Sequence, residues 1–131
     1  MNSHTQVQVF SATKETVFAF LSNIQNLPKW ATGFAKELKE IDGEYKVVTP
    51  QGEIFFRMES NAGTGIIDMY GGPTKEQMAY FPSRVIATPE NKSAYMFTNF
   101  QWPGIPDEVF AAQNGTLVEE FENIIKQVET R

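Results

Sequence analysis

The chain has 131 residues, of which 41% are hydrophobic and 21% charged, as expected for a single folded domain. Its net charge is −5, which argues against nucleic acid or an anionic membrane as the main partner. It contains no cysteine, so disulfides, thiol nucleophiles and cysteine-based metal sites are excluded. No apolar run approaches the length of a membrane span, and no leader peptide is visible. We expect one domain over residues 1–131, with a cytoplasmic location and no membrane insertion.

The N-terminal part predicts one strand followed by two short helices. Residues 5–10 alternate between valine and glutamine, which indicates a half-buried strand. Residues 14–22 carry apolar side chains at helical spacing. A second short helix restarts at residues 26–28, where Pro28 is tolerated in the first turn, and Trp30 lies on this helix.

Turn signals at short intervals divide the middle of the chain into a meander of six strands. Asp42-Gly43 is a typical hairpin turn, and we expect residues 71–73, Gly-Gly-Pro, to break a strand. A bend or bulge is expected near Pro82, because proline cannot donate to a strand ladder. The six strands are predicted at residues 34–41, 44–49, 53–60, 65–70, 77–87 and 93–102.

A long amphipathic helix is predicted over residues 107–129, with the acidic residues on the face opposite its apolar stripe. Gly115 interrupts it, either as a local weakness or as a place where the helix clears a ligand. The stripe consists of Phe110, Leu117, Phe121, Ile124, Ile125 and Val128. The element order therefore predicts an α+β fold, in which a curved antiparallel sheet of seven strands is covered by the long C-terminal helix.

Three stretches resemble the START-like, SRPBCC or helix-grip superfamily. Residues 17–23, VFAFLSN, are similar to the family's first helix, and residues 26–30, NLPKW, followed by Phe34, to its second. Residues 98–101 before Pro103-Gly104 resemble its last strand running into the long helix. The sequence is most similar to bacterial members of the polyketide cyclase/dehydrase and lipid-transport branch. The resemblance implies a helix-grip fold with a cavity between the sheet and the C-terminal helix.

No recognisable catalytic or metal-binding motif is present. The only histidine is His4, which with no cysteine cannot make a usual zinc site, and we expect neither a metal nor a cofactor. Asp68 is a candidate general acid or base if it faces the cavity, and a solvated surface aspartate if it does not. Arg84 is a weaker candidate that could anchor a ligand carboxylate.

The aromatic content of 13% includes eleven phenylalanines, which line either a dense core or a cavity. Ligand pockets are mostly apolar, and methionine adapts their walls to ligand shape. Each candidate residue for the cavity wall could equally be plain core. The residues predicted to line a cavity are Trp30, Phe34, Tyr45, Phe56, Met58, Asp68, Tyr80, Met96, Phe100 and Phe110.

Three functional hypotheses follow from these observations and from the resemblance. The first is binding or transport of a small hydrophobic molecule such as a lipid, an isoprenoid or an aromatic metabolite, by a monomer or weak homodimer without catalysis. The second is an enzyme similar to a polyketide cyclase, a dehydratase or a hydrolase, which uses a cavity carboxylate. The third is a protein-interaction module similar to chaperone cofactors, which predicts an exposed apolar patch and no sizeable cavity.

Overall fold

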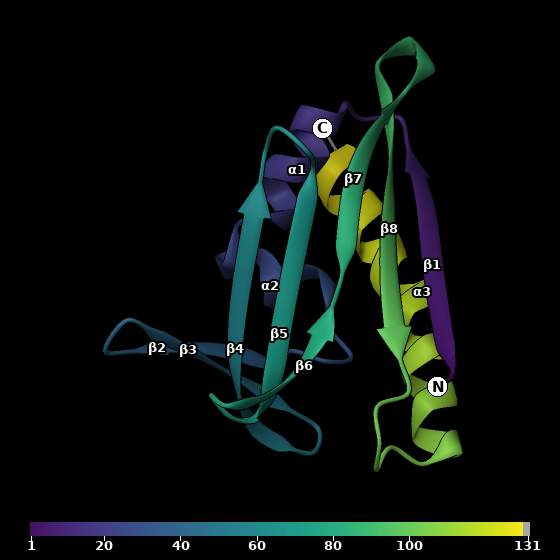
Figure 1. Cartoon of the computed structure of the whole chain (residues 1–131). Coiled ribbons are helices and arrows are strands. Elements are labelled where there is room, and N and C mark those ends of the chain that lie inside the picture. The colour runs from purple at the N-terminus through teal and green to yellow at the C-terminus, as the bar shows by residue number, and fades with distance from the viewer. Residues whose placement is uncertain (130–131) are drawn as a thin grey trace.

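The computed structural model describes residues 1–129, in which an antiparallel sheet curves around a long C-terminal helix (Figure 1). Two short 3₁₀ turns, Ile24–Asn26 and Pro89–Asn91, complete the regular structure. The helices are α1 (Lys14–Leu21), α2 (Leu27–Trp30) and α3 (Asp107–Glu129). The strands are β1 (Ser3–Phe10), β2 (Glu37–Ile41), β3 (Glu44–Thr49), β4 (Gly52–Asn61), β5 (Ile66–Thr74), β6 (Gln77–Phe81), β7 (Ser83–Thr88) and β8 (Lys92–Phe100).

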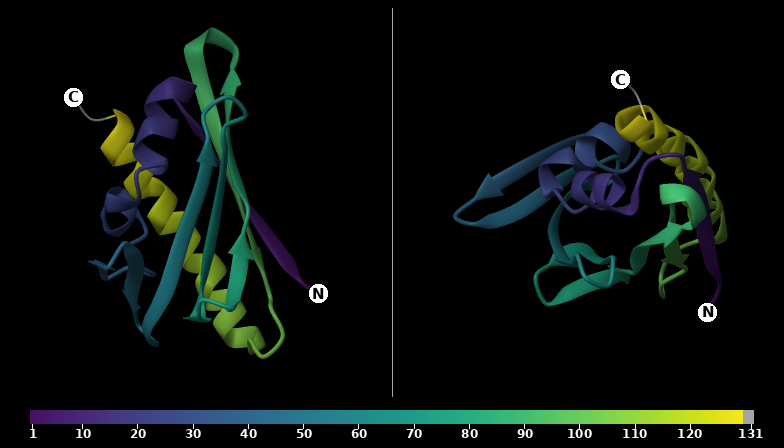
Figure 2. Two further views of the ribbon diagram at one scale, coloured as in Figure 1. Left: turned by 60° about the vertical axis from the view of Figure 1, so that its left-hand side comes forward. Right: turned by 90° about the horizontal axis from the view of Figure 1, so that it is seen from above.

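The sheet order is β1-β8-β7-β5-β4-β3-β2, with β6 paired to β5 beside this path, and every pairing is antiparallel. Seen from above, the sheet curls so that the β2–β3 hairpin and β1 stand at its two ends (Figure 2). α3 packs against β1, α1 and α2. This arrangement confirms the predicted α+β helix-grip architecture, with two short helices after the first strand. No helix within residues 1–129 has the length and hydropathy required to cross a bilayer.

The sheet differs from the prediction at two proline-containing segments. The predicted strand 77–87 is divided at Pro82 into β6 and β7, so the sheet has eight strands instead of seven. The predicted break at residues 71–73 is wrong, because β5 continues to Thr74 through a bulge. Gly72 makes this possible, since a Cβ atom there would lie 2.0 Å from the carbonyl oxygen of Gln77 on the paired strand.

The C-terminal half of α3 fills the concave side of the sheet with large side chains. Phe121 is fully buried, and its ring contacts Trp30 at a centroid distance of 6.4 Å and Tyr95 at 5.4 Å. Leu117, Ile124 and Val128 continue the same stripe and are at most 5% exposed. This half of the interior is therefore solid core, as expected for a helix with an apolar stripe.

Gly115 lies on the exposed side of α3, and a Cβ atom added to it would meet no atom within 4 Å. Its place on the solvent-exposed side favours the interpretation that Gly115 is a local weakness of the helix. We expect Gly115→Ala to raise the free energy of unfolding by about 0.5–1 kcal/mol, because alanine has the higher helix propensity. Chemical denaturation checks this. A loss of stability would show that the helix needs glycine at this position.

Candidate functional site

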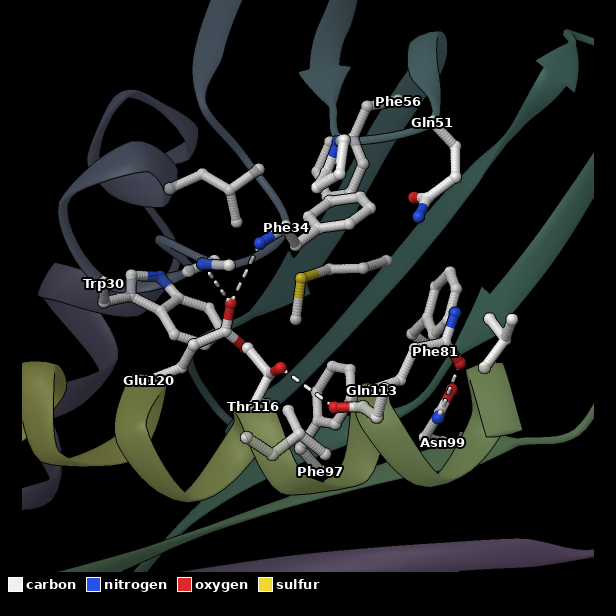
Figure 3. A pocket seen from close by; sticks show the side chains of 18 of the residues that line it. Trp30, Phe34, Gln51, Phe56, Phe81, Phe97, Asn99, Gln113, Thr116 and Glu120 are labelled. Atoms are coloured by element: carbon white, nitrogen blue, oxygen red, sulfur yellow. Dashed lines mark hydrogen bonds between the residues drawn. The ribbon is translucent and has the colours of Figure 1, made fainter. Parts of the chain in front are cut away.

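A cavity of about 400 Å³ lies between the sheet and the N-terminal half of α3 (Figure 3). The space exists because the N-terminal half of α3 presents small or polar side chains to the sheet. The C-terminal half of α3 presents large apolar side chains, which fill the corresponding space. Ala112, Gln113 and Thr116 follow the helical period that continues into Leu117 and Glu120. The volume falls within the range of roughly 300–1,000 Å³ that is typical of small-molecule sites.

The remaining walls are mainly apolar and come from distant parts of the chain. The sheet contributes inward-facing residues of β4, β5, β6 and β8, and the segment from α2 to β2 contributes residues that lie against α3 near Glu120. The lining residues outside α3 are Leu27, Trp30, Ala31, Gly33, Phe34, Pro50, Gln51, Phe56, Met69, Phe81, Phe97 and Asn99. Such a wall suits an apolar ligand with a few polar groups.

Glu120 is the main polar feature of this cavity. Its side chain is only 4% exposed, and its Oε2 atom accepts hydrogen bonds from the backbone N–H groups of Gly33 at 3.0 Å and Phe34 at 3.2 Å. Figure 3 shows these two bonds beside Trp30. The other carboxyl oxygen, Oε1, has no hydrogen-bond partner among residues 1–129. It is therefore available to a ligand.

Burial raises the pKa of Glu120 to about 7, although the N–H groups of Gly33 and Phe34 act in the opposite direction. The neighbouring carboxylate of Glu119 raises this pKa further, and the ammonium group of Lys36 lowers it. Both charged and neutral forms of Glu120 are thus accessible near neutral pH. A group of this kind can bind a cation, donate a hydrogen bond or transfer a proton.

The turn that holds Glu120 depends on a glycine. After α2, the N–H groups of Phe34 and Ala35 bond back to the carbonyl of Ala31, which folds residues 31–35 into a tight turn. Gly33 lies at the tip, and a Cβ atom there would approach Thr116 Cγ2 to 2.1 Å. The absence of a side chain lets α3 come close enough for Glu120 to reach the backbone donors.

A second polar group lies at the other end of the cavity, where Asn99 is 5% exposed. Its Nδ2 atom donates to Gln113 Oε1 at 3.2 Å and to Asn114 Oδ1 at 3.0 Å. Figure 3 shows Asn99 beside Phe81, away from Glu120. The cavity therefore offers one carboxyl group and one amide cluster, separated by apolar wall.

Three of the predicted wall residues, Trp30, Phe34 and Phe56, line this cavity. Phe34 does so from the turn before β2 and not from a strand, because the strand predicted at 34–41 begins only at Glu37. Two further predicted residues, Tyr45 and Met58, line a second depression of about 370 Å³ next to Ser22 and Ile24. They share the inward sheet face with Phe56, which lines both spaces.

The prediction that Asp68 and Tyr80 line the cavity is wrong. In β5 the inward residues are Ile67 and Met69, so Asp68 points to the opposite face of the sheet. There its Oδ1 atom accepts a hydrogen bond of 2.7 Å from the hydroxyl of Tyr80, which raises the pKa of Tyr80 to about 12. Because this pair lies outside the cavity, Asp68 is not a candidate acid or base for a ligand bound there.

Four more predicted residues lie elsewhere. Met96 and Phe100 occupy the outer face of β8, whose inward residues are Tyr95, Phe97 and Asn99. Phe100 contacts the ring of Trp102 at a centroid distance of 5.6 Å. Phe110 is half-buried on α3, outside the residues that line the cavity, and exposed Arg84 donates from Nε to the carbonyl of Thr64.

Sequence reasoning missed Glu120 by assigning all acidic residues of the helix to its solvent face. The signal was present, because Glu120 follows Leu117 by three residues and precedes Ile124 by four, which places it on the apolar stripe. Asn99 was missed because the sequence pattern of this strand does not indicate which face the residue presents. Within residues 1–129, no group of three or more His, Cys, Asp or Glu side chains is arranged to hold a metal ion.

No protein-family model matches the chain, and no curated protein matches its sequence. Several solved structures share its fold. The Zhui aromatase/cyclase from a Streptomyces species is 11% identical with a TM-score of 0.75, covering 99% of this chain and 94% of its own. The Aha1 dimer from Colwellia psychrerythraea is 16% identical with a TM-score of 0.74, and the coverages are 99% and 98%. A START superfamily protein from Mycobacterium smegmatis is 12% identical with a TM-score of 0.65, and both coverages are 97%.

Proposed function

Because the chain has the helix-grip fold of START-like proteins, we propose that it binds a small, largely apolar molecule in the cavity between the sheet and α3. The observation that carries this proposal is the cavity itself, since aromatic side chains that could have closed the interior surround an open space of about 400 Å³. Glu120 and Asn99 fix the orientation of the bound molecule, because a few polar groups on an apolar wall give such sites their specificity.

The size of the cavity also distinguishes among the hypotheses. A pure protein-interaction module has no need of an interior space, so the cavity supports small-molecule binding over that alternative. The apolar wall favours a hydrophobic ligand. The polar side chains that α3 adds to this wall favour a ligand with at least one hydrogen-bonding group.

Filling the cavity tests this proposal. Ala112 is among the residues of α3 that line it, whereas the neighbouring Ala111 is not. We expect Ala112→Trp to lower the affinity for N-phenylnaphthylamine, a neutral fluorescent apolar probe, by more than about tenfold. Ala111→Trp is the matched control and is expected to leave the affinity within about twofold of the wild type. Equal binding of the probe by all three proteins would place it outside the cavity and contradict the proposal.

Glu120 favours a second candidate function, an enzyme that transfers a proton in the manner of a cyclase or dehydratase. Its accessible oxygen and its pKa of about 7 suit a general acid or base, which works best near the ambient pH. The test is to incubate the wild type and Glu120→Gln with a small-molecule extract of the host. This candidate predicts that one metabolite is consumed by the wild type alone. Identical metabolite profiles with both proteins would contradict it.

A further inference from the structure

The charges on the cavity wall are all of one sign. Glu120 lies deep in the cavity, and Glu108 lies on the exposed first turn of α3, which also borders it. None of the lining residues, all of which belong to the described part of the chain, is a lysine, arginine or histidine. A ligand carboxylate or phosphate would therefore enter an apolar site without a cationic partner, at a large cost in desolvation.

A cation, in contrast to an anion, would find a partner in the cavity, because the carboxylate of Glu120 can bind it. Glu120 is only 4% exposed, and its Oε1 atom has no partner among residues 1–129. An ammonium group has three hydrogen-bond donors, and its positive charge balances the negative charge of a buried carboxylate. An N⁺–H···O⁻ hydrogen bond is roughly twice as strong as one between neutral groups. A cation at Oε1 would therefore offset the desolvation of the carboxylate.

Aromatic rings surround the same end of the cavity. The ring of Trp30 lies beside Glu120, and Phe34 is the residue whose N–H group binds Oε2 (Figure 3). The negative faces of such rings attract cations, and a tryptophan attracts them best. A carboxylate combined with aromatic walls is the environment that favours an organic ammonium group over a neutral hydroxyl.

We propose that the ligand is an apolar amine whose protonated nitrogen binds Oε1 of Glu120 while its hydrocarbon or aromatic body fills the remaining cavity. This inference rests on the proposed function and specifies its ligand class. Fatty acids, phosphates and other anions are disfavoured by the same wall. Neutral alcohols are accepted, but more weakly than amines of equal size.

The groups around Glu120 determine how binding depends on pH. Glu119 on α3 opposes its ionisation and Lys36, from the segment before β2, favours it. Tyr95 on β8 stays neutral, since burial raises the pKa of its hydroxyl. Glu120, with a pKa of about 7 in the free protein, must be ionised to pair with an ammonium group. The affinity for an amine should therefore fall by up to about tenfold for each pH unit below 7 and level off above it.

Three compounds with the same aromatic body test this inference: phenylbutylamine, phenylbutanol and phenylbutyrate. Dissociation constants are measured at pH 8 by NMR titration of the isotope-labelled protein. We expect the amine to bind at least about tenfold more tightly than the alcohol, and the carboxylate to bind most weakly. Glu120→Gln should remove the preference for the amine over the alcohol. Glu119→Gln makes the same change in charge outside the cavity and should preserve the preference.

The outcomes separate this inference from the function on which it rests. Binding of the alcohol as tightly as the amine, or an amine preference that persists in Glu120→Gln, would overturn the amine inference alone. Failure of all three compounds to bind would overturn both. Titration of the wild type between pH 6 and 8 needs no variant and keeps the test decisive if Glu120→Gln does not fold. An amine affinity that does not change over this range would contradict the role of Glu120.

Discussion

Replacement of Glu120 by glutamine is expected to stabilise the protein at alkaline pH and to flatten the dependence of its stability on pH. The buried carboxyl group has a pKa of about 7 in the folded protein against an ordinary value of 4.5. Between these two values the folded state binds more protons than the unfolded state, so the free energy of unfolding falls as the pH rises. The total loss for this one group is about 3 kcal/mol.

Glutamine keeps an oxygen that can accept the N–H groups of Gly33 and Phe34 but has no charge to desolvate. We therefore expect Glu120→Gln to exceed the wild type in unfolding free energy by about 2–3 kcal/mol at pH 8, and by much less at pH 5. Urea denaturation at several pH values measures the difference, with Glu119→Gln as the control for net charge. Parallel curves for the wild type and Glu120→Gln would show that Glu120 titrates normally.

The wild type would thus be less stable than its own variant because it retains a buried carboxylate. Such a loss is common where a binding or catalytic group is held in an environment that suits its ligand. The pairing of an ammonium group with Glu120 would return this stability on binding. The same residue therefore connects the stability of the protein to the proposed specificity of its cavity.

Gly33→Ala is expected to be strongly destabilising, because its Cβ atom would lie 2.1 Å from Thr116 Cγ2. The turn and α3 would have to separate, at a cost of about 1–3 kcal/mol. The same movement would take the backbone N–H donors away from Glu120 and raise its pKa further.

A second substitution identifies the cause of this loss. Thr116→Ser removes the methyl group and keeps the hydroxyl, which donates to the carbonyl of Ala112. We expect Thr116→Ser to restore most of the stability that Gly33→Ala loses, as measured by a double-mutant cycle in urea. The account of this contact would be wrong if Gly33→Ala were as stable as the wild type, or if Thr116→Ser restored nothing.

Local sequence signals predicted most of the fold. The Asp42-Gly43 turn has positive φ at both residues, of 54° and 80°, as the hairpin signal requires. The helical period gave the bounds of α3 at Asp107 and Glu129, as the structure has them. Pro82 indicated the interruption that separates β6 from β7. These features depend on neighbouring residues and are therefore readable from the chain alone.

The face that each strand turns to the cavity was harder to predict. In β8 the run from Ala94 to Phe97 is apolar on both sides, so alternation does not reveal that Tyr95 and Phe97 point inward and Met96 outward. In β1 the half-buried side includes Gln6 and Gln8, while Val7 and Val9 are 51% and 60% exposed. Where polar residues face inward and apolar residues face outward, the inward face of a strand is determined only by its packing against the paired strands and α3.

The cavity depended on a contact that no local pattern encodes. The carboxylate of Glu120 meets the N–H groups of residues 33 and 34 across a sequence separation of more than eighty residues. Its position on the apolar stripe was visible, but its partners were not. The open space likewise follows from small side chains on α3 that face large rings on the sheet, which is a property of the packed structure.

The most direct test of the central claim is native mass spectrometry of the wild type, Ala112→Trp and Ala111→Trp after incubation with a small-molecule extract of the host. We predict a one-to-one adduct on the wild type that is absent from Ala112→Trp and present on Ala111→Trp. Denaturing extraction should then release an apolar compound. An adduct retained equally by all three proteins, or no adduct on the wild type, would contradict the claim that the cavity beside Glu120 is a ligand-binding site.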